Sequence, residues 1–428
     1  MLLPADRALV LRDPGLPALG LLLDEEGLGT WLADQRGIPV RWSTRYLRYK
    51  QGTSCLIAGD LETPEGTRHC FASAHASDAL EKVTKSLRRA PAGSVLGTDP
   101  ARGLVVATPP ADRDLPALAR LDDERRRRRL LRGLIGDRSG VRDAELRTLR
   151  YKPQRRWVGV VRLRHGPTMV LRVYRPGEAR RAVEAIRACS VGAGTPALIG
   201  ADESRGVAAV EHVQGAVLSG ASGAGEPGDL AAVRSAGSAL ARLHSSRDVV
   251  LHGRGTTEAD AVLLAADQLV ALLPDQADDV RALSAKVAGR LLNITQVRLP
   301  VHGDFSLDQV VVDQAGMARL IDLDEAHLGD PASDLACVAA ALARDTVLGN
   351  VSADLATSWL EALREGYADV VAPPDEERLA VHTAAHLLRR AVEPFRLRQT
   401  ADWPEAAGEL LTRARQIVTS ASFMEGVR

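Results

Sequence analysis

The sequence predicts an α+β fold in which a sheet-rich front is followed by a mostly helical back. The first observation is an internal repeat, because residues 41–120 and 143–222 match each other and each copy contains short apolar runs around turn residues. The second is the spacing of apolar residues after Asp229, which recur at intervals of three and four, as in helices that pack by one face. We therefore expect a duplicated antiparallel sheet before a helical region.

The repeat is defined by motifs that recur about one hundred positions apart. Residues 46–50 (YLRYK) recur as 148–152 (TLRYK), 102 positions later. At an offset of 103, Leu115 matches Leu218, and a further set matches in the same way: Gly97, Asp99, Arg102 and Gly103 with Gly200, Asp202, Arg205 and Gly206. Glu81 falls at the place of Glu184. A common offset over so long a stretch indicates two copies of one unit.

Each copy should fold as a small sheet crossed by one helix. In the second copy, residues 149–163 form one strand-like run, and residues 169–174 form another after a Gly-Pro turn. A helical stretch at 178–189 and short apolar strands at 197–199 and 207–210 complete the order strand, strand, helix, strand, strand. Five consecutive arginines, 125–129, are expected to lie on a solvated helical linker between the copies.

The helical back contains one connection and several helices. Residues 215–228 are rich in Gly, Ala and Ser, which favours a flexible connection. Asp229 is a suitable N-cap for the first helix, and stretches 261–292, 357–367 and 376–391 are predicted to be helical.

Composition excludes several classes of partner. Lys plus Arg equals Asp plus Glu, and aromatic residues make up only 3% of the chain, so neither a general nucleic-acid surface nor an acidic-membrane surface is expected. The four cysteines are far apart and form no CxxC pair, which favours a reduced, cytoplasmic protein. The chain starts without the charge pattern of a signal peptide and has no apolar run of membrane-spanning length.

A candidate chemical site lies between His302 and Asp334. Residues 313–316 form a turn signal, so residues 309–312 and 317–321 should pair as a hairpin, with Asp322 opposite residue 307 or 308. That pairing brings Asp322 beside Gln309 and the loop that contains Asp304. Oxygen ligands in such an arrangement suit Mg²⁺ together with phosphates, and a second carboxylate can take the proton of an attacking hydroxyl.

Three motifs in this region resemble the signature of aminoglycoside phosphotransferases and their protein-kinase-like relatives. They are His302-Gly303-Asp304 followed by Gln309, then Ile321-Asp322-Leu323-Asp324, then Gly329-Asp330-Pro331-Ala332-Ser333-Asp334. The run 240–244 (LARLH) also looks like the helix that precedes the catalytic loop in this family. The resemblance covers roughly residues 143–400 and implies a bilobal protein-kinase-like fold, with an antiparallel-sheet N-lobe and a helical C-lobe.

The resemblance implies a role for each residue of the C-terminal motifs. Asp304 would be the catalytic base, and Asp322 would hold Mg²⁺ that bridges the phosphates of ATP. Gln309 stands where the family usually has asparagine and would be a second metal ligand. His302, Asp330 and Asp334 would support the loop.

The second copy of the repeat would then be the nucleotide-binding N-lobe. Residues 151–156, which include Lys152, would lie over the phosphates, and Glu211 to Val213 would be the hinge that binds adenine. Glu184 would pair with the strand cation, which is lysine in most relatives and is offered here by Arg172 or Lys152.

The first copy departs further from the family, since Ala72 stands near the place of the cation and Pro109-Pro110 occupies the hinge. We therefore expect an additional, degenerate N-lobe-like domain that serves as a cap or platform, with its linker, at 1–140. The nucleotide-binding N-lobe would span 141–222, and the helical catalytic and acceptor-binding C-lobe 223–428.

Three functions remain open at this point. The first is ATP-dependent transfer of the γ-phosphoryl group to a hydroxyl of a small molecule, such as an aminoglycoside, a sugar or another natural product. The second is a pseudokinase-like binding or scaffold protein, favoured by Arg172 and Gln309. The third is a kinase of a precursor peptide in natural-product maturation, in which the N-terminal domain binds a peptide or protein.

Overall fold

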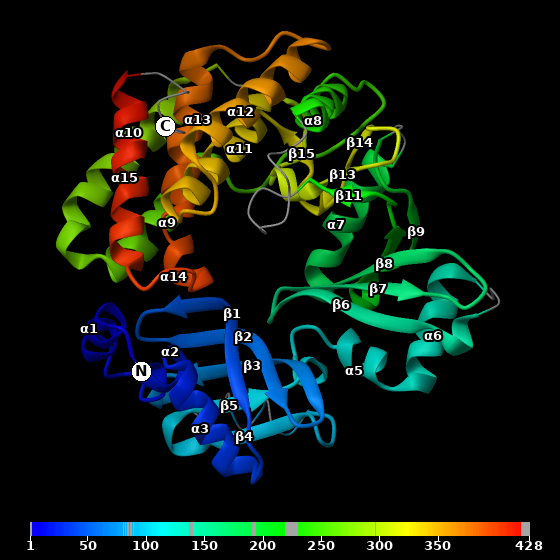
Figure 1. Cartoon of the computed structure of the whole chain (residues 1–428), viewed down its shortest axis with the longest axis vertical. Coiled ribbons are helices and arrows are strands. Elements are labelled where there is room, and N and C mark those ends of the chain that lie inside the picture. Colours follow the sequence, from blue (N-terminus) through cyan, green and yellow to red (C-terminus); the bar gives the residue numbers. More distant parts are fainter. Residues whose placement is uncertain are drawn as a thin grey trace. The chain divides into compact units, whose positions relative to one another are not determined.

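The chain divides into two compact units, which are described separately (Figure 1). In this computed structural model the described residues are 2–79, 81, 83, 85, 88, 90–136, 140–190, 194–218, 230–295 and 297–420. Unit 1 contains Met1–Arg180, Ile199–His212 and Phe395–Trp403, and unit 2 contains Arg181–Leu198, Val213–Pro394 and Pro404–Arg428. Both sheets of the duplicated front belong to unit 1 apart from one end residue, and the helical back forms most of unit 2.

The first sheet of unit 1 is antiparallel, with the strand order β1-β2-β3-β5-β4. Its strands are β1 (Arg41–Lys50), β2 (Ser54–Thr63), β3 (Gly66–His75), β4 (Val95–Asp99) and β5 (Leu104–Ala107). Three helices precede it: α1 (Pro4–Arg12), α2 (Leu19–Leu23) and α3 (Glu25–Arg36). The side chain of Asp24 caps the start of α3, and Gly37, in the left-handed conformation, follows its end.

The second sheet has the same topology, β6-β7-β8-β10-β9. Its strands are β6 (Glu145–Lys152), β7 (Arg156–Arg162), β8 (Thr168–Tyr174), β9 (Leu198–Asp202) and β10 (Val207–Glu211), with α7 (Pro176–Cys189) between β8 and β9. The expectation of a single strand over 149–163 was wrong, because the Pro153-Gln154 turn divides this run into β6 and β7. Each copy therefore has three strands before its helical segment.

The duplication begins earlier than its most obvious sequence match. Asp13 and Leu16 precede the first sheet, and Asp112 and Leu115 precede the second, within the similar segments 13–19 (DPGLPAL) and 112–118 (DRDLPAL). In both places the leucine N–H donates to the aspartate carbonyl at 3.2 Å. Leu115 therefore also matches Leu16, while Leu218, its match at the offset of 103, lies beyond the second sheet, where its N–H donates to the carbonyl of Val310.

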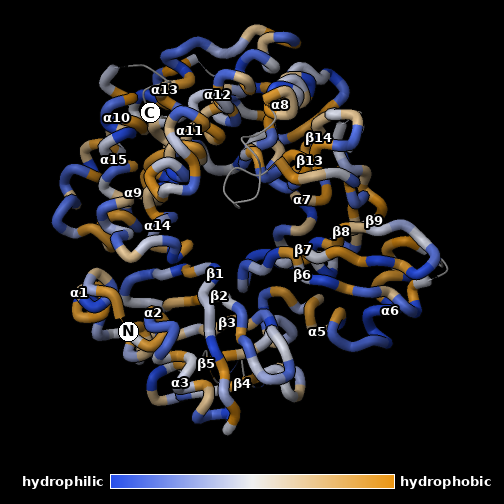
Figure 2. Tube along the Cα trace, in the orientation of Figure 1, coloured by the Kyte–Doolittle hydropathy of each residue, from blue (hydrophilic) through white to orange (hydrophobic). Residues whose placement is uncertain are grey.

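The arginine-rich segment between the copies is more than a linker. It forms α6 (Glu124–Ile135), which follows α5 (Ala117–Asp122), and the tube near α6 carries both hydrophilic and hydrophobic colours in Figure 2. The side chains of Leu130, Leu131, Leu134 and Ile135 are buried in one hydrophobic cluster with residues of both sheets, including Phe71 and Trp157. The two copies therefore share a core to which α6 contributes its apolar face.

Unit 2 is built mainly from helices. They are α8 (Leu230–His244), α9 (Glu258–Leu272), α10 (Ala277–Asn293), α11 (Pro331–Val347), α12 (Ala353–Ala368), α13 (Glu376–Arg390) and the larger part of α15 (Trp403–Ser420), while α14 (Glu393–Leu397) begins in this unit. The helices predicted at 357–367 and 376–391 are confirmed. The stretch 261–292 is helical but is broken between α9 and α10, after Leu272. Most of the predicted 215–228 connection lies outside the described residues.

Two short sheets in unit 2 position the candidate site. One has the order β11-β13-β14, from β11 (Ala216–Val217), β13 (Val310–Val312) and β14 (Ala318–Leu320). The other pairs β12 (Leu299–Val301) with β15 (His327–Gly329). One hydrophobic cluster, which includes Phe305, Leu320 and Leu335, joins these strands to α8, α11 and α12. Among the described residues, no helix combines the length and apolar character needed to cross a bilayer.

Candidate functional site

The loop that follows β12 is held by a buried carboxylate from α11. Asp334 is 1% exposed, and its Oδ2 and Oδ1 atoms accept hydrogen bonds from the backbone N–H groups of His302 at 2.6 Å and Gly303 at 2.8 Å. Its Oδ2 atom also lies 3.0 Å from Nε2 of His244, whose Nδ1 is 2.9 Å from the hydroxyl of Tyr367. One carboxylate therefore orders two consecutive peptide groups directly before Asp304.

The charge of Asp334 is stabilised although the side chain is buried. Burial opposes ionisation, but the hydrogen bond from His244 and the charges of His244 and His302 keep the pKa of Asp334 below its ordinary value. The expectation that His302 and Asp334 support the loop agrees with these contacts.

His302 connects the loop to the neighbouring hairpin. Its Nε2 atom donates to the carbonyl of Ile321 at 2.8 Å, and its ring packs on Phe305 with centroids 5.6 Å apart. Gly303 has φ +84°, and a Cβ atom there would lie 2.4 Å from the carbonyl oxygen of Glu325. Position 303 therefore has room for glycine alone, because both the backbone conformation and the close carbonyl exclude a side chain.

The hairpin forms as the turn predicted. Val310 pairs with Leu320 and Val312 with Ala318, and the N–H of Ile321 donates to the carbonyl of Gln309 at 2.9 Å. The expected register is confirmed up to this bond, which places Asp322 directly after the residue that pairs with Gln309. Asp322 has φ +65° and ψ +44°, a left-handed conformation that is uncommon outside glycine, although aspartate adopts it more readily than most residues.

The side-chain oxygen of Gln309 is buried and lacks a hydrogen-bond donor among the described residues. The side chain is 6% exposed, and the atom in question is Oε1. A buried amide oxygen that lacks a donor costs free energy unless another electropositive group meets it. An amide oxygen and a carboxylate such as that of Asp322 are hard donors of the kind that could hold Mg²⁺.

Asp304 is exposed, and its charge reaches two side chains that the sequence did not indicate. The charge of Asp304 acts on Arg390 of α13 and on the thiol of Cys337 of α11. Nη2 of Arg390 lies 3.2 Å from Sγ of Cys337, and its Nη1 lies 3.3 Å from both carboxylate oxygens of Glu393. The candidate base therefore lies within electrostatic reach of a largely buried guanidinium.

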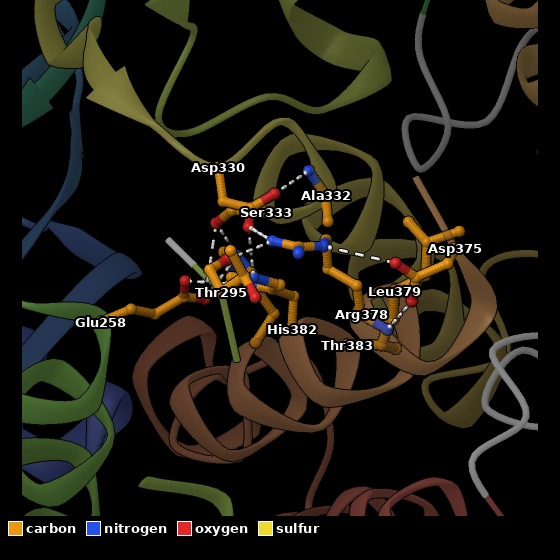
Figure 3. Close-up of polar contacts among 11 residues, drawn as sticks. Glu258, Thr295, Asp330, Ala332, Ser333, Asp375, Arg378, Leu379, His382 and Thr383 are labelled. Atoms are coloured by element: carbon orange, nitrogen blue, oxygen red, sulfur yellow. Dashed lines mark hydrogen bonds and ion pairs between the residues drawn. The ribbon is translucent and has the colours of Figure 1, made fainter. Parts of the chain in front are cut away.

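Arg390 ends a buried polar seam between α11 and α13, part of which Figure 3 shows. On α13, Arg378, His382, His386 and Arg390 follow one another at intervals of four, so they share one face. Facing them from α11 and its N-cap are Asp330, Ser333 and Cys337. The four-residue spacing was the available signal for this seam, but on a helix such spacing is equally typical of a solvated face.

Glu258, the first residue of α9, closes the seam. Its Oε2 atom lies 2.7 Å from Nδ1 of His382, and Oδ2 of Asp330 lies 3.6 Å from Nε2 of the same ring (Figure 3). Burial alone would lower the pKa of His382, but the charge of Glu258, the hydrogen bond to Glu258 and the charge of Asp330 raise it to about 10. His382 is therefore an imidazolium between two carboxylates. Asp330, which was expected to support the loop, caps α11 and forms ion pairs with His382 and Arg378 of α13.

The residues proposed for nucleotide binding fall in both units. Arg172 is buried in the middle of β8, where it pairs with Ala208 and Val158, and Lys152 ends β6. Glu211 ends β10 in unit 1, whereas the compact units divide between His212 and Val213. Glu184 lies on the part of α7 that belongs to unit 2, together with Asp304, Gln309 and Asp322.

The first copy lacks the corresponding cation, as expected, but the residue in its place differs from the expected one. Ser73 pairs with Val105 and Leu56, which is the register that Arg172 has with Ala208 and Val158 in the second copy. Ser73, rather than Ala72, therefore occupies the position of Arg172.

Several solved structures have chains that are similar in fold to this one, at low sequence identity. An amicoumacin kinase in complex with AMP-PNP, Ca²⁺ and Ami has 12% identity and a TM-score of 0.50, over 72% of this chain and 96% of that chain. A choline/ethanolamine kinase family protein from Mesorhizobium loti has 17% identity and a TM-score of 0.45, over 66% and 91% of the two chains. A macrolide 2′-phosphotransferase from Brachybacterium faecium has 21% identity and a TM-score of 0.40, over 62% and 91%.

No curated protein matches the chain. The family model described as "Phosphotransferase enzyme family" matches residues 150–382, which include the second sheet from the end of β6 onward and the site from His302 to Asp334. This match spans more than half of the 428 residues and agrees with the protein-kinase-like α+β fold. The chain therefore belongs to the phosphotransferase enzyme family and is a kinase that uses an alcohol group as acceptor.

Proposed function

We propose that this protein transfers the γ-phosphoryl group of ATP, with Mg²⁺, to a hydroxyl group of a small molecule such as an aminoglycoside, a sugar or another natural product. The observation that carries the proposal is the convergence of the loop before Asp304 with the strand before Asp322. The bond between Ile321 N–H and the Gln309 carbonyl and the bond between His302 and the Ile321 carbonyl hold the two together.

Each residue of this site has a proposed role. Asp304 is exposed, as a general base must be, and accepts the proton of the acceptor hydroxyl. Asp322 and Gln309 hold the metal, which fits the buried, unpartnered Oε1 atom of Gln309 among the described residues. When bound, Mg²⁺ neutralises charge on the phosphates, while Asp334 keeps the loop in place for the transfer.

Residues of the second copy bind the nucleotide in this proposal. Arg172 and Lys152 supply positive charge for the phosphates, Glu184 pairs with the strand cation, and the backbone from Glu211 to Val213 meets the adenine. The structural neighbour solved with AMP-PNP and Ca²⁺ supports a nucleoside triphosphate with a divalent cation. All four cysteines are free and buried, in keeping with a reducing cytoplasm.

Calorimetric titration of ATP with and without Mg²⁺, on the native protein and on Asp322→Ala, tests the nucleotide site. Binding in the micromolar range that requires both Mg²⁺ and Asp322 is the expected result. A screen of hydroxyl acceptors then identifies the substrate class. Phosphorylation of a peptide serine or threonine, in place of a small molecule, would establish the precursor-peptide alternative.

The pseudokinase alternative rests on Arg172 in place of lysine and Gln309 in place of asparagine. It predicts no phosphoryl transfer and no Mg²⁺-dependent ATP binding at millimolar nucleotide, with the fold intact. Restoring the family residues by Arg172→Lys and Gln309→Asn, singly and together, provides the matched test. Activity that appears only in the restored variants would favour the pseudokinase.

A further inference from the structure

The β6–β7 turn of the second copy adopts a conformation that is unusual for its residue. The N–H of Arg155 donates to the carbonyl of Lys152 at 3.1 Å, and Gln154 between them has φ +58°. Pro153 and this positive φ define a type II turn, whose third position favours glycine. A left-handed conformation at a residue with a side chain costs about 1–2 kcal/mol, so the turn needs outside support.

The first copy contains the same turn without this cost. The N–H of Thr53 donates to the carbonyl of Lys50 at 3.0 Å, and the third position is Gly52, with φ +61°. In both copies a preceding aspartate clasps the turn. Oδ2 of Asp13 accepts from the N–H of Gly52 at 2.9 Å, and Oδ2 of Asp112 accepts from the N–H of Gln154 at 2.7 Å. The aspartate clasp is therefore common to both turns, and the glutamine belongs to the second alone.

The side chain of Gln154 makes the contact that distinguishes the two turns. Its Oε1 atom accepts a hydrogen bond of 2.6 Å from Nη2 of Arg48, which lies on β1 of the first copy, 106 positions earlier. A glycine at this position could not form that bond. The strained glutamine thus connects the turn of one copy to a strand of the other.

Positive charge accumulates around this contact. Burial, Arg155 and Arg175 lower the pKa of Arg48, whereas Tyr46 and Asp114 act in the opposite direction. Nη1 of Arg175 bonds Glu178 at 3.1 Å, but its Nε atom is buried with no hydrogen-bond partner in the described part of the chain. Arg155 and Arg175 therefore repel the Arg48 guanidinium, and the unpartnered Nε atom of Arg175 in this described region favours an anion nearby.

We propose that the first copy completes the nucleotide site of the second: Arg48 positions the β6–β7 turn through Gln154, and the arginines at the turn provide the field that attracts the polyphosphate of the nucleotide. The inference rests on the proposed function, in which this turn lies over the phosphates. It gives the additional N-terminal domain a role in nucleotide affinity, with Arg48 as a positioning residue.

Two variants test the link from opposite sides. Arg48→Ala removes the donor, and Gln154→Gly removes the acceptor while retaining a turn that the first copy already forms with Gly52. Both are expected to raise the KM for ATP about tenfold, as for loss of one charged hydrogen bond, with the KM for the acceptor unchanged. Arg45→Ala is the control on the same strand, since Arg45 is 71% exposed and pairs with Asp60. Wild-type KM values for ATP in both variants would overturn the proposal.

The double variant shows whether the two residues act together. If Arg48 works through Gln154, Arg48→Ala/Gln154→Gly has the same KM for ATP as the worse single variant. Additive increases would mean that Arg48 acts on the nucleotide independently, and positioning through Gln154 would then be wrong.

A readout without nucleotide separates this proposal from the proposed function. The amide of Gln154 donates to Asp112, so its hydrogen exchange reports the order of the turn. Exchange at residues 152–156 is expected to be faster in Arg48→Ala than in the native protein and in Arg45→Ala. If the native protein neither binds nor uses ATP, the proposed function fails, whereas unchanged exchange in Arg48→Ala overturns the positioning role even in an active enzyme.

Discussion

The carboxylate of Asp334 accepts a hydrogen bond from the backbone N–H of Gly303, across 31 positions of sequence. Because the same carboxylate also binds the N–H of His302, the first turn of α11 sets the path of the chain into Asp304. The rigidity of the loop therefore depends on a helix that follows it, and on the side chain of His244 that stabilises the charge of Asp334.

Asp334→Asn tests this dependence. An amide supplies one acceptor in place of two and turns an N–H group toward donors, so the variant should lose about 2 kcal/mol of unfolding free energy. We expect kcat to fall about 10–100-fold, because groups that orient catalytic residues have effects of this size. Chemical denaturation and steady-state kinetics measure the two quantities. Asp278→Asn, on the exposed face of α10, is the control, and equal kinetics in the two variants would contradict the orienting role.

Gly303→Ala should be more harmful than the same change at another glycine with positive φ. A Cβ atom at 303 meets the Glu325 carbonyl oxygen at 2.4 Å, whereas one at Gly316, with φ +78°, meets no described atom within 4 Å. In both variants the alanine must adopt an unfavourable left-handed backbone conformation, but Gly303→Ala must also displace the chain near Asp304. We expect it to lose about 2 kcal/mol more unfolding free energy than Gly316→Ala, measured by thermal denaturation. Similar losses would show that the close carbonyl moves aside readily.

Gln309→Leu separates a metal-binding role from a structural one. Leucine approximates the volume of glutamine but lacks its unpartnered oxygen, so the metal-free variant should be as stable as the native protein or more stable. If the oxygen binds Mg²⁺, the concentration of Mg²⁺ that gives half-maximal activity should rise about tenfold or more. A magnesium titration checks the second expectation. An unchanged Mg²⁺ requirement would remove Gln309 from the metal site.

His382 is expected to make the free energy of unfolding fall as the pH rises into the alkaline range. Its pKa of about 10 in the folded protein exceeds the ordinary value of 6.5, so its contribution is complete below pH 6.5 and is lost as the pH rises toward 10. His386 has a pKa lowered to about 3 by burial and by the charge of Arg389, so its contribution changes only below pH 6.5. Glu258, with a pKa of about 2, loses its contribution only as the pH falls below 4.5.

Above neutral pH the difference between the native protein and His382→Gln isolates His382, because the buried cysteine thiols, whose pKa values burial also raises, contribute equally to both proteins. Between about pH 7 and about pH 9.5, the native protein should lose at least about 1 kcal/mol more unfolding free energy than His382→Gln. Denaturant titrations at the two pH values supply the comparison. His252→Gln, a change at an exposed histidine before α9, should retain the native pH dependence. A native protein whose stability is flat over this interval would contradict the buried imidazolium.

The sequence predicted the features that depend on neighbouring residues or on motifs with a characteristic spacing. The register of the β13–β14 hairpin followed from its turn, and the three motifs between His302 and Asp334 indicated the family. The β6–β7 turn was harder to interpret as a strand boundary, because valine-rich residues on both sides of Pro153-Gln154 continued one apolar run. At this point the turn at Pro153-Gln154 decided the structure, although the hydrophobic pattern suggested a continuous strand.

Features that depend on distant partners were not predicted. Arg378, His382, His386 and Arg390 form a regular polar stripe, which becomes a buried seam only because α11 and Glu258 supply partners. No spacing within α13 distinguishes these two outcomes. The contact between Arg48 and Gln154 was equally hidden, although the recurrence of the segment from Asp13 at Asp112 would have revealed the common clasp.

That clasp also bears on the history of the molecule. Asp13 binds Tyr49 and the amide of Gly52, and Asp112 binds Tyr151 and the amide of Gln154, with hydroxyl–carboxylate distances of 2.7 and 2.9 Å. Independent origin of the same pair of bonds in both halves is improbable, so the ancestral unit already possessed them before its gene segment was copied. Divergence has since placed Arg172 in the second half where the first has Ser73, while the pair of bonds that shapes each sheet was preserved.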